Sequence, residues 1–276
     1  MHQIAFVVVN YGDPSETEKF VMNVQNLAGS EKCLVVIVDN ESTRESQQRL
    51  QQLESGFSHV EVINLEENLF YWGGARFALD HLAKRSTFTP QWIIVCNNDI
   101  EIVTEEFIND LLSLDYMQYG VIAPSIVSTI TGRDQNPYRV RQLSRIDQLR
   151  FRLQHAHYYF GKLFFWTRKL LCKFRSYRRI TSSNAAQEIY APHGSFVIFS
   201  KRFFEMGGYL DGGFRMYGEE LTTAEIAKGI GASVLYSPFL KILHREHSTT
   251  GSTYTRQTAR YNAEAYKYFV SRYLKP

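Results

Sequence analysis

The sequence predicts an α/β fold with a doubly wound, mostly parallel sheet. Four short apolar runs, rich in β-branched residues, alternate with segments of helical pattern, as strands alternate with helices in this fold class. Each run ends abruptly in polar residues, as strands buried in a parallel sheet do. The length of 276 residues suits one large domain, or one domain with an appendage, and the contents of 44% hydrophobic and 21% charged residues are typical of a globular protein.

The expected strands of the first half cover residues 4–9, 33–38, 60–65 and 92–96. Between them we expect a helix from Ser15, a polar helix over residues 43–53, and a helix that Gly73-Gly74 opens and that continues through Leu82. The carboxyl ends of parallel strands share one edge of a sheet, so the polar residues at these ends should be neighbours. These residues are Asn10, Asp39, Asn68 and Asp99.

Further elements are expected in the second half. Residues 190–199 combine a small-residue turn with an apolar strand, and residues 201–206 have the pattern of a short helix. Residues 229–236 indicate a helix end and another strand, whereas residues 256–274 form an amphipathic helical pattern with many tyrosines.

The stretch QWIIVCNNDIEI, residues 91–102, is the first candidate for chemistry. Its apolar part predicts the fourth strand, and two amides and the carboxylate of Asp99 follow directly, with Glu101 two residues later. Carboxylates at this edge suit a hard divalent cation, with phosphate oxygens completing its shell. The alternative is an Asx-turn, in which these side chains satisfy backbone groups after a strand.

Two common nucleotide-binding motifs are absent from the sequence. The first strand is followed by Asn-Tyr-Gly-Asp-Pro, whereas a dinucleotide fingerprint needs Gly-x-Gly-x-x-Gly there, and the chain contains no Walker A sequence. A bound phosphate would therefore be held by a metal ion and by side chains such as Arg76, which follows the Gly73-Gly74 pair.

A basic insert, residues 133–180, stands out from the rest of the chain. It holds 13 Lys and Arg and two acidic residues, a net charge of +11, whereas the other residues carry −8. The run HYYFGKLFFWTRKLLCKF has aromatic residues in adjacent positions and basic residues scattered through it. This pattern resembles an interfacial helix at an anionic membrane. Binding of single-stranded nucleic acid and a packed helical hairpin with a solvated basic side are the alternatives.

The cysteines and the amino terminus indicate a cytoplasmic protein. The three cysteines, at positions 33, 96 and 172, are far apart and lack metal-ligand spacing, so buried free thiols in a reducing compartment are expected. The sequence begins without a basic leader, and its first apolar run is too short for a signal peptide core or a membrane span.

Several motifs, taken in order, resemble the family 2 glycosyltransferases of GT-A fold. The resemblance is greatest to the bacterial rhamnosyltransferase-like branch, which builds surface polysaccharides, and it spans most of residues 4–250 outside the insert. The matching segments are VVVNYGD, VDNES, ENLFYWGGARFAL, NNDIEI, APHGSFVIFSKRFFEMGGYLDGGFRMYGEEL and ILHREHSTTG. The resemblance implies an inverting, metal-dependent transfer from dTDP-rhamnose or a UDP-sugar to a surface-polysaccharide or lipid-linked glycan.

The resemblance also implies a donor pocket and a metal ligand. Asn10, Tyr11 and Asp39 would line the pocket for the base and ribose. Asn98 and Asp99 stand at the Asp-x-Asp-like motif, where Asp99 would bind Mg²⁺ or Mn²⁺. The amide of Asn98 departs from that motif and removes one charge from the metal site. The full set of expected donor-binding residues is Asn10, Tyr11, Asp39, Asn68, Gly74, Arg76 and Asn98.

On the acceptor side, the resemblance implies a catalytic carboxylate. The family has Glu-Asp where this chain has Glu219-Glu220, and the second acid is the base that deprotonates the acceptor hydroxyl, so Glu220 is the candidate and Glu219 its rival. Without the resemblance, this pair reads as the acidic start of a helix. Thr222 and Ile226 replace an acid and an arginine that the family often has. The expected acceptor-binding residues are His193, Gly194, Ser195 and Tyr217.

Two further expectations concern the metal and the donor. His244 is expected to reach the metal or diphosphate, with His247 orienting it. His193 is open to a structural role as a hydrogen-bonding residue. Residues 248–252, STTGS, have the small, polar composition of a loop that closes over the donor.

The expected organisation follows from these assignments. Residues 1–132 form the donor half, residues 133–180 the insert, residues 181–255 the acceptor and catalytic half of the same domain, and residues 256–276 a terminal helix. The family's lipid-linked acceptors favour a peripheral position on the inner face of the cell membrane for the insert. The alternatives are a membrane- or nucleic-acid-binding protein on an inactive transferase core, and a nucleotidyltransferase, which would need a Gly-rich, Lys-bearing loop that the first strand lacks.

Overall fold

The computed structural model describes residues 2–175, 185–246 and 255–274. Its strands and helices alternate as the sequence predicts. In chain order they are β1 (Ile4–Asn10), α1 (Ser15–Gln25), the 3₁₀ turn η1 (Ser30–Lys32), β2 (Cys33–Asn40), α2 (Arg44–Gly56), β3 (Val60–Leu65), α3 (Phe70–Leu82), β4 (Trp92–Cys96), β5 (Ile100–Ile102), α4 (Phe107–Leu112), β6 (Val121–Ser128), α5 (Arg145–Ala156), α6 (Tyr158–Arg175), β7 (Gln187–Glu188), β8 (Phe196–Ser200), α7 (Lys201–Glu205), α8 (Glu219–Gly229), β9 (Val234–His244) and α9 (Arg256–Tyr273).

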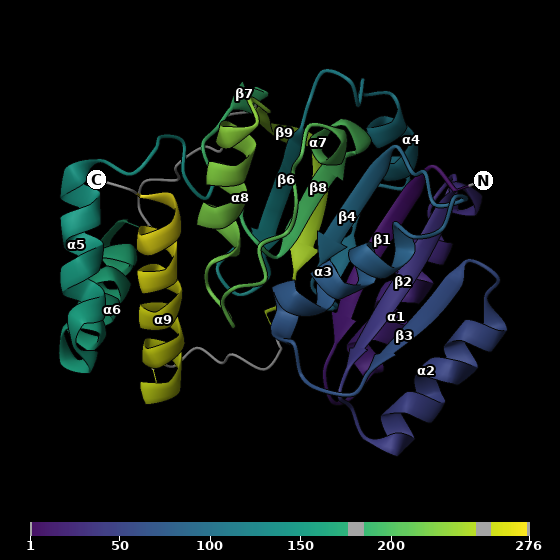
Figure 1. Ribbon diagram of the computed structural model, residues 1–276, viewed down its shortest axis with the longest axis horizontal. Helices are drawn as coiled ribbons and strands as arrows, with labels where there is room; N and C mark the ends of the chain where they lie inside the picture. The colour runs from purple at the N-terminus through teal and green to yellow at the C-terminus, as the bar shows by residue number, and fades with distance from the viewer. Residues whose placement is uncertain (1, 176–184, 247–254, 275–276) are drawn as a thin grey trace.

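One central sheet organises the molecule (Figure 1). Its strand order is β3-β2-β1-β4-β8-β6-β9-β5, with β7 paired to β9. The strands β3, β2, β1 and β4 are parallel, and the register aligns Asn10 with Asp39 at the carboxyl ends of β1 and β2. The strand β8 runs antiparallel to β4, so its first residue, Phe196, lies opposite Cys96 at the carboxyl end of β4. The predicted α/β fold with a mostly parallel sheet is confirmed.

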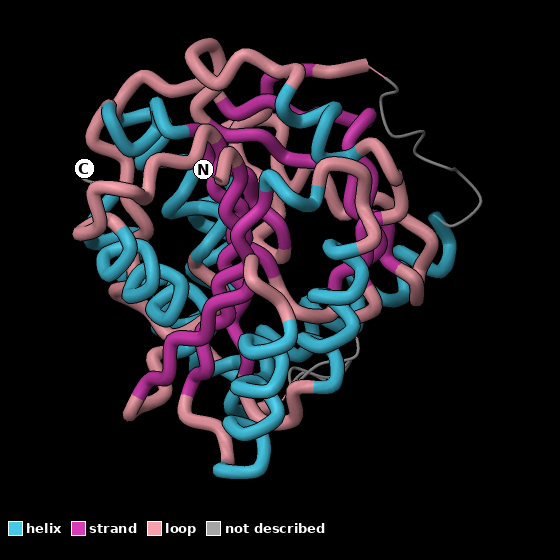
Figure 2. The backbone as a smooth tube through the Cα atoms, turned by 90° about the vertical axis from the view of Figure 1, so that its right-hand side faces the viewer, coloured by secondary structure: helices cyan, strands magenta, loops and turns pink. Residues whose placement is uncertain are grey.

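Helices cover both faces of the sheet, as the view along its edge shows (Figure 2). On one face, side chains of α3, α7 and α8 pack against β1, β2, β4 and β8 around Trp72 and Phe199. On the other face, α1, α2 and α4 pack around Phe6, Phe20 and Phe107. Every residue of β1 is buried, which explains why this strand is a continuous apolar run without alternation.

Two predicted elements have different boundaries in the structure. Helix α3 begins at Phe70, not at the Gly73-Gly74 pair, because Asn68 Oδ1 accepts the Phe70 backbone N–H (2.8 Å) and starts the helix earlier. The two glycines therefore lie inside α3. Strand β9 continues to His244, past the expected end at residue 236, because its later part pairs with β5 and β6 across a register shift after Pro124.

Helices α5, α6 and α9 form a group beside the sheet (Figure 1). Leu143, Tyr266 and Phe269 make the small core of this group. The helix expected over residues 256–274 is confirmed as α9. It is joined to the main domain at the buried Asp211 carboxylate, which accepts from Tyr268 Oη (2.8 Å) and from the Tyr273 hydroxyl.

Within the described residues, no helix has both the length and the apolar character needed to cross a membrane. The free thiols of Cys33 and Cys96 are buried in the sheet, as expected.

Candidate functional site

A buried hydrogen-bond network joins the ends of β1, β2 and β4. The Asn10 amide nitrogen donates to Asp39 Oδ1 (3.2 Å), and Asn10 Oδ1 accepts from the Thr17 hydroxyl (2.7 Å) on α1. Asn98, after β4, donates to Thr17 Oγ1 (3.0 Å). Asn10, Asp39 and Thr17 are fully buried. The structure thus brings these polar strand ends together, and the amide of Asn98 extends the network to β4.

Asn68 lies at the same edge of the sheet, where it contacts Asn40. Its Oδ1 accepts from the Asn40 amide (2.8 Å), and Asn40 Oδ1 accepts the Leu69 backbone N–H (2.8 Å). The two amides thus join the end of β2 to the start of α3. Asn68 therefore lies beside the Asn10 network through Asn40, the residue after Asp39.

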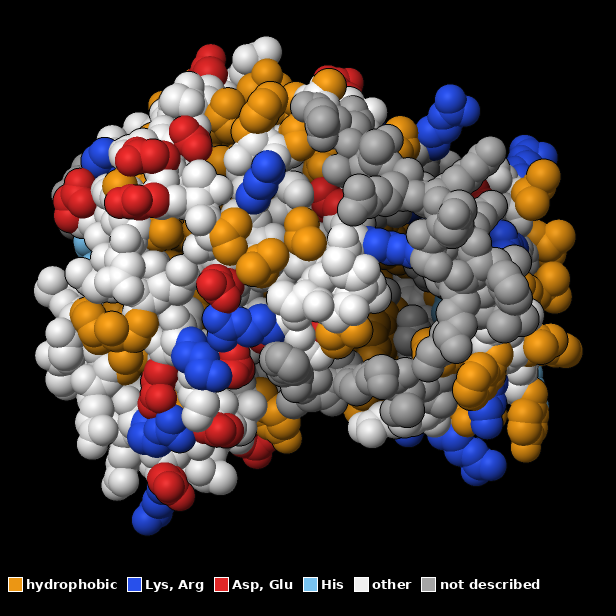
Figure 3. Space-filling view, turned by 180° about the vertical axis from the view of Figure 1, so that it is seen from behind, with side chains coloured by type: hydrophobic (Ala, Val, Ile, Leu, Met, Phe, Trp, Pro, Cys, Tyr) orange, Lys and Arg blue, Asp and Glu red, His pale blue; other side chains and the backbone are white. Residues whose placement is uncertain are grey.

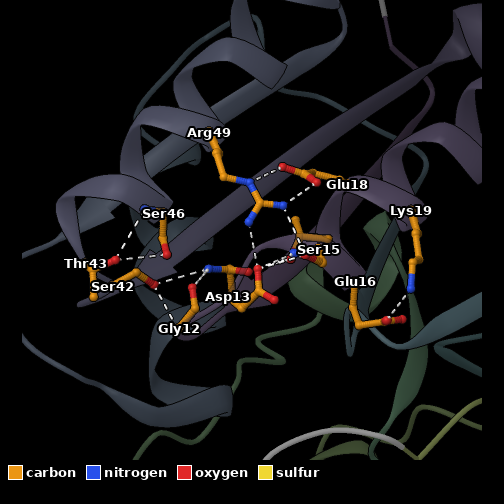
Figure 4. Close-up of polar contacts among 12 residues, drawn as sticks. Gly12, Asp13, Ser15, Glu16, Glu18, Lys19, Ser42, Thr43, Ser46 and Arg49 are labelled. Carbon is orange, nitrogen blue, oxygen red and sulfur yellow. Dashed lines mark hydrogen bonds and ion pairs between the residues drawn. The ribbon is translucent and has the colours of Figure 1, made fainter.

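Tyr11 follows β1 in an exposed loop, with 52% of its surface accessible. Two contacts from the segment that follows β2 hold this loop (Figure 4). The Gly12 backbone N–H donates to Ser42 Oγ (3.0 Å), and Arg49 on α2 forms an ion pair with Asp13 (2.9 Å). Tyr11 is thus an aromatic side chain on a restrained loop next to the buried network.

Gly74 and Arg76, both on α3, have different environments. Gly74 packs on the sheet, where a Cβ atom would lie 3.5 Å from Val9 and 3.6 Å from Val38. The Arg76 side chain is about half exposed, and its Nε lies 3.5 Å from Asp80 on the next turn. Gly74 therefore serves helix-to-sheet packing, whereas Arg76 is available at the surface.

Asp99 and His244 form a deeply buried pair of polar side chains in the site. His244 Nε2 lies 3.3 Å from Asp99 Oδ1, and the two side chains are almost inaccessible to solvent. The pair is placed by antiparallel pairing of β5 with β9, which aligns Ile100 with His244. His244 Nδ1 contacts Gln135 Oε1 (2.8 Å), at the start of the insert.

The segment His193–Ser195 lies beside this pair, because β8 follows it and runs antiparallel to β4. The Asn97 backbone N–H donates to the Ser195 carbonyl (2.9 Å), and His193 Nδ1 contacts Ser195 Oγ (2.9 Å). The His193 ring centroid is 6.2 Å from that of His244. Burial lowers the pKa of His193 to about 4, and the nearby His244 adds to this shift, so His193 is neutral at physiological pH.

The acidic pair at the start of α8 faces the same segment. Glu220 Oε1 accepts the Gly194 backbone N–H (3.3 Å), and Tyr71 Oη donates to the Gly194 carbonyl (2.9 Å). Burial, followed by the charge of Glu220, raises the pKa of Glu219 to about 8. Burial also raises the pKa of Glu220. Tyr217 precedes the pair in a left-handed conformation, φ +69°.

Glu101, the second carboxylate of the stretch that contains Asp99, has a different partner. The Glu101 carboxylate pairs with Arg245 (2.5 Å), so it points to a different partner. Among residues 2–175, 185–246 and 255–274, no group of three or more His, Cys, Asp or Glu side chains has the arrangement of a metal site. The expected orienting residue His247 and the expected closing loop, residues 248–252, lie outside the described residues.

The structure also reveals polar residues that the sequence pattern did not single out. Thr17, Asn40, Tyr71 and Gln135 each contact an expected site residue. Asn136 joins them, because its Oδ1 accepts the His193 backbone N–H (2.8 Å). The only signal for the last two in the sequence was the run of turn-forming residues Asp-Gln-Asn-Pro at the start of the insert.

Comparison with known families and proteins adds to this geometry. The family model described as Glycosyl transferase family 2 matches residues 5–205. A comparison with curated protein sequences gives no match.

Solved structures share the fold at low sequence identity. GalNAc-T7 with UDP, GalNAc and Mn²⁺ has a TM-score of 0.60 at 13% identity, covering 98% of this chain and 51% of that chain. The mannosyltransferase PcManGT from Pyrobaculum calidifontis, in complex with GDP-Man and Mn²⁺, has a TM-score of 0.57 at 12% identity, covering 98% and 64%. TarS from S. aureus has a TM-score of 0.55 at 13% identity, covering 89% and 37%. This chain thus spans between about a third and two thirds of the length of these proteins.

Proposed function

Because the chain belongs to glycosyl transferase family 2, we propose that it is an inverting glycosyltransferase that uses a nucleotide-sugar donor. The proposed donor is dTDP-rhamnose or a UDP-sugar, in keeping with the rhamnosyltransferase-like motifs, and the proposed acceptor is a surface-polysaccharide or lipid-linked glycan. The observation that carries the proposal is the meeting of two groups at His193–Ser195. The Asp99–His244 pair lies on one side of this segment, and the Glu220 carboxylate bonds to its Gly194 backbone.

The donor side is supported by the buried network and the exposed ring beside it. Asp39 and Asn10 offer hydrogen-bonding groups fixed by Thr17 and Asn98, which suits recognition of a base and ribose. Tyr11 presents an accessible aromatic face on which a base can stack. The structures of GalNAc-T7 and PcManGT contain UDP and GDP-Man, respectively, which supports a nucleoside diphosphate as the common part of the donor.

Asp99 and His244 fit a divalent cation, Mg²⁺ or Mn²⁺. The carboxylate oxygen and the imidazole nitrogen converge at 3.3 Å, and an oxygen and a nitrogen ligand suit both ions. Two fold relatives contain Mn²⁺. Bound there, the ion would offset the negative charge of the departing nucleoside diphosphate. Asn98 is held in the buried network. Asp99, which carries the one carboxylate of the NND motif, is therefore the proposed ligand.

Glu220 is the proposed general base. Burial and the charge of Glu220 raise the pKa of Glu219 to about 8, so Glu219 holds its proton at neutral pH and is less suited to act as the base. The Gly194 N–H stabilises the charge of Glu220 and directs the carboxylate toward the acceptor segment. Burial makes Glu220 a stronger proton acceptor than an exposed carboxylate.

These positions support an inverting reaction. The acceptor hydroxyl attacks the anomeric carbon of the donor from the face opposite the nucleotide, and the bond from that carbon to the diphosphate oxygen breaks. Glu220 takes the hydroxyl proton as the new glycosidic bond forms. His193, being neutral, and Ser195 are suited to hydrogen-bond the acceptor sugar.

Transfer assays with a donor panel test this proposal. The purified protein is incubated with Mn²⁺, each of dTDP-rhamnose, UDP-glucose, UDP-galactose and GDP-mannose, and lipid-linked glycan acceptors, and the anomeric configuration of the product is read by NMR. We expect transfer from one dTDP or UDP donor with inversion. Glu220→Gln should lower kcat by about 10²–10⁴-fold, whereas Glu205→Gln, an exposed carboxylate on α7, serves as the matched control. Retention of configuration, or full activity of Glu220→Gln, would contradict the proposal.

A membrane-facing role of the insert is supported by its exposed side chains. Along α5, Ile146, Leu149 and Leu153 follow helical spacing and are exposed, Ile146 by 79%. On α6 the exposed apolar side chains are Tyr159, Phe160, Leu163 and Trp166. Figure 3 shows hydrophobic and basic side chains gathered along the edge of the molecule where these helices lie.

The charge of the same surface supports an anionic bilayer as its partner. Arg145, Arg150, Arg152 and Lys162 are exposed beside the apolar side chains. The one acid of α5, Asp147, is engaged by Arg139 (3.0 Å). A second copy of the chain would bring a surface of like charge to this face, which disfavours a dimer. Single-stranded nucleic acid binds by stacking its bases on aromatic rings, but about half of the exposed apolar side chains here are aliphatic. Anionic headgroups and acyl chains match both components of the surface.

Vesicle flotation tests this part of the proposal. The protein should float with phosphatidylglycerol-containing vesicles at low salt. With phosphatidylcholine vesicles it should remain unbound in the bottom fraction. The pair Leu149→Glu and Leu163→Glu should abolish flotation, whereas Phe239→Glu replaces an equally exposed apolar residue on β9 and should leave it unchanged. Binding of a labelled oligonucleotide without flotation would favour the nucleic-acid alternative instead.

A further inference from the structure

A relay of three buried or half-buried side chains, Gln135, Glu246 and Ser128, lies behind the Asp99–His244 pair. His244 Nδ1 contacts Gln135 Oε1 at 2.8 Å, and the Gln135 amide nitrogen donates to Glu246 Oε1 at 2.6 Å. The second oxygen of Glu246 accepts from Ser128 Oγ at 2.7 Å. The relay joins β6, the start of the insert and the end of β9, so its members are brought together only by the fold.

The hydrogen-bonding capacity of each group in the relay fixes which atoms donate and which accept. A carboxylate only accepts hydrogen bonds, so Glu246 requires the NH₂ group of Gln135 to face it. The carbonyl oxygen of Gln135 must then face His244, and this oxygen also only accepts. His244 Nδ1 therefore carries hydrogen and donates, which leaves Nε2 as the nitrogen that faces Asp99.

This orientation leaves two acceptor atoms facing each other. In the neutral ring, the Nε2 lone pair and Asp99 Oδ1 are 3.3 Å apart, an arrangement that a shared cation stabilises. An outer carboxylate or amide that fixes the ring of a histidine ligand is the usual support of such sites.

Glu246 holds its place at a conformational cost. Its φ is +53°, in the left-handed region that a glutamate rarely adopts. Both of its carboxylate oxygens are engaged by the relay, one by Gln135 and one by Ser128. The Glu246 side chain is thus directed back toward the site, not into solvent.

We infer that Gln135 and Glu246 are positioning residues, which act through His244 by presenting its Nε2 beside Asp99 as a ligand atom for the divalent cation. The inference rests on the proposed function for the identity of the cation. It extends the site by two residues that contact neither donor nor acceptor in the proposed reaction. It also explains how a site with Asn98 in place of an acid gains a second protein ligand.

Mn²⁺ binding to the full chain, measured by electron paramagnetic resonance without nucleotide, tests the inference. Gln135→Leu and Glu246→Leu should each weaken Mn²⁺ affinity by about 10–100-fold. Glu246→Gln keeps an oxygen for the Gln135 amide and should bind nearly as wild type. Gln142→Leu replaces an exposed glutamine of the same insert and is the matched control. Thermal unfolding of each variant verifies that it is folded.

A double-mutant cycle separates positioning from general loss of structure. If Gln135 acts through His244, then Gln135→Leu should cause no further loss of Mn²⁺ affinity in the His244→Ala protein. An equal loss in both backgrounds, wild-type affinity of a folded Gln135→Leu protein, or absence of Mn²⁺ binding by the wild type would overturn the inference. If the predicted pattern of Mn²⁺ affinities is found but no sugar is transferred, the relay stands and the proposed function fails.

Discussion

Replacement of Glu219 by Gln should make the protein more stable, and increasingly so at alkaline pH. Glu219 is 7% exposed, and its pKa in the folded state is raised from 4.5 to about 8, mainly by burial and then by the charge of Glu220. The unfolded chain has no such shift, so the folded state binds the Glu219 proton more tightly. The stability that this carboxyl contributes is complete below pH about 4.5 and is lost as pH rises to about 8.

The size of the effect follows from the shift. One pKa unit corresponds to about 1.36 kcal/mol, so a rise from 4.5 to about 8 sets a ceiling of about 5 kcal/mol. Glutamine keeps the shape of the protonated acid and cannot ionise. The free energy of unfolding of Glu219→Gln, relative to wild type, should therefore increase by several kcal/mol between pH 5 and pH 9.

Urea unfolding at intervals across this pH range, followed by tryptophan fluorescence, measures the difference. Glu105→Gln replaces an exposed carboxylate and gives the reference for the loss of an ordinary negative charge. Parallel stability curves for wild type and Glu219→Gln would refute the reasoning, because they would mean that Glu219 ionises in the folded protein as freely as in the unfolded one.

Three further substitutions probe the site and its supports. Gly194→Ala would place a Cβ 3.2 Å from Glu220 Oε1, so we expect kcat to fall by about tenfold with an unchanged circular dichroism spectrum, because the base is displaced. Gly74→Ala meets its neighbours at ordinary contact distance, so it should raise the stability of α3 by about 0.5–1 kcal/mol, and donor KM should stay constant if Gly74 acts in packing alone. Asp211→Ala removes the acceptor of Tyr268, so urea unfolding should show a loss of about 1–3 kcal/mol, and hydrogen exchange should show it in α9.

Much of the fold was predictable because the sheet imposes a local pattern. Buried parallel strands need uninterrupted apolar runs, and the polar residues that end these runs must share one edge, so Asn10, Asp39, Asn68 and Asp99 were recognisable from their positions alone. The start of α3 was not, because the Gly73-Gly74 pair suggested that the helix begins there, whereas it begins at Phe70. Only the fold shows that Gly74 lies inside the helix and packs on Val9, and that Asn68 starts the helix.

The contacts of the acceptor side were harder to predict from the sequence because they join residues that are distant in the chain. Glu220 meets Gly194 across 26 positions, and His244 meets Gln135 across 109. No periodicity encodes such pairs. Motif resemblance indicated Glu220 and His244 because both lie within matched segments, whereas Gln135 lies in the insert, which no motif covered.

Residues 134–136, at the start of the insert, contact the candidate site and also lead into the helices that follow. Gln135 orients His244, Asn136 accepts the His193 N–H, and Asp134 accepts from Tyr236 Oη (2.7 Å) beneath them. Removal of residues 133–180 would therefore disturb the proposed metal pair and the segment His193–Ser195 together with helices α5 and α6. A protein lacking the whole insert could lose activity for either reason. The exposed positions on α5 and α6 face away from these contacts, so substitutions there separate membrane attachment from catalysis, and a variant that no longer floats should still transfer sugar to a soluble acceptor.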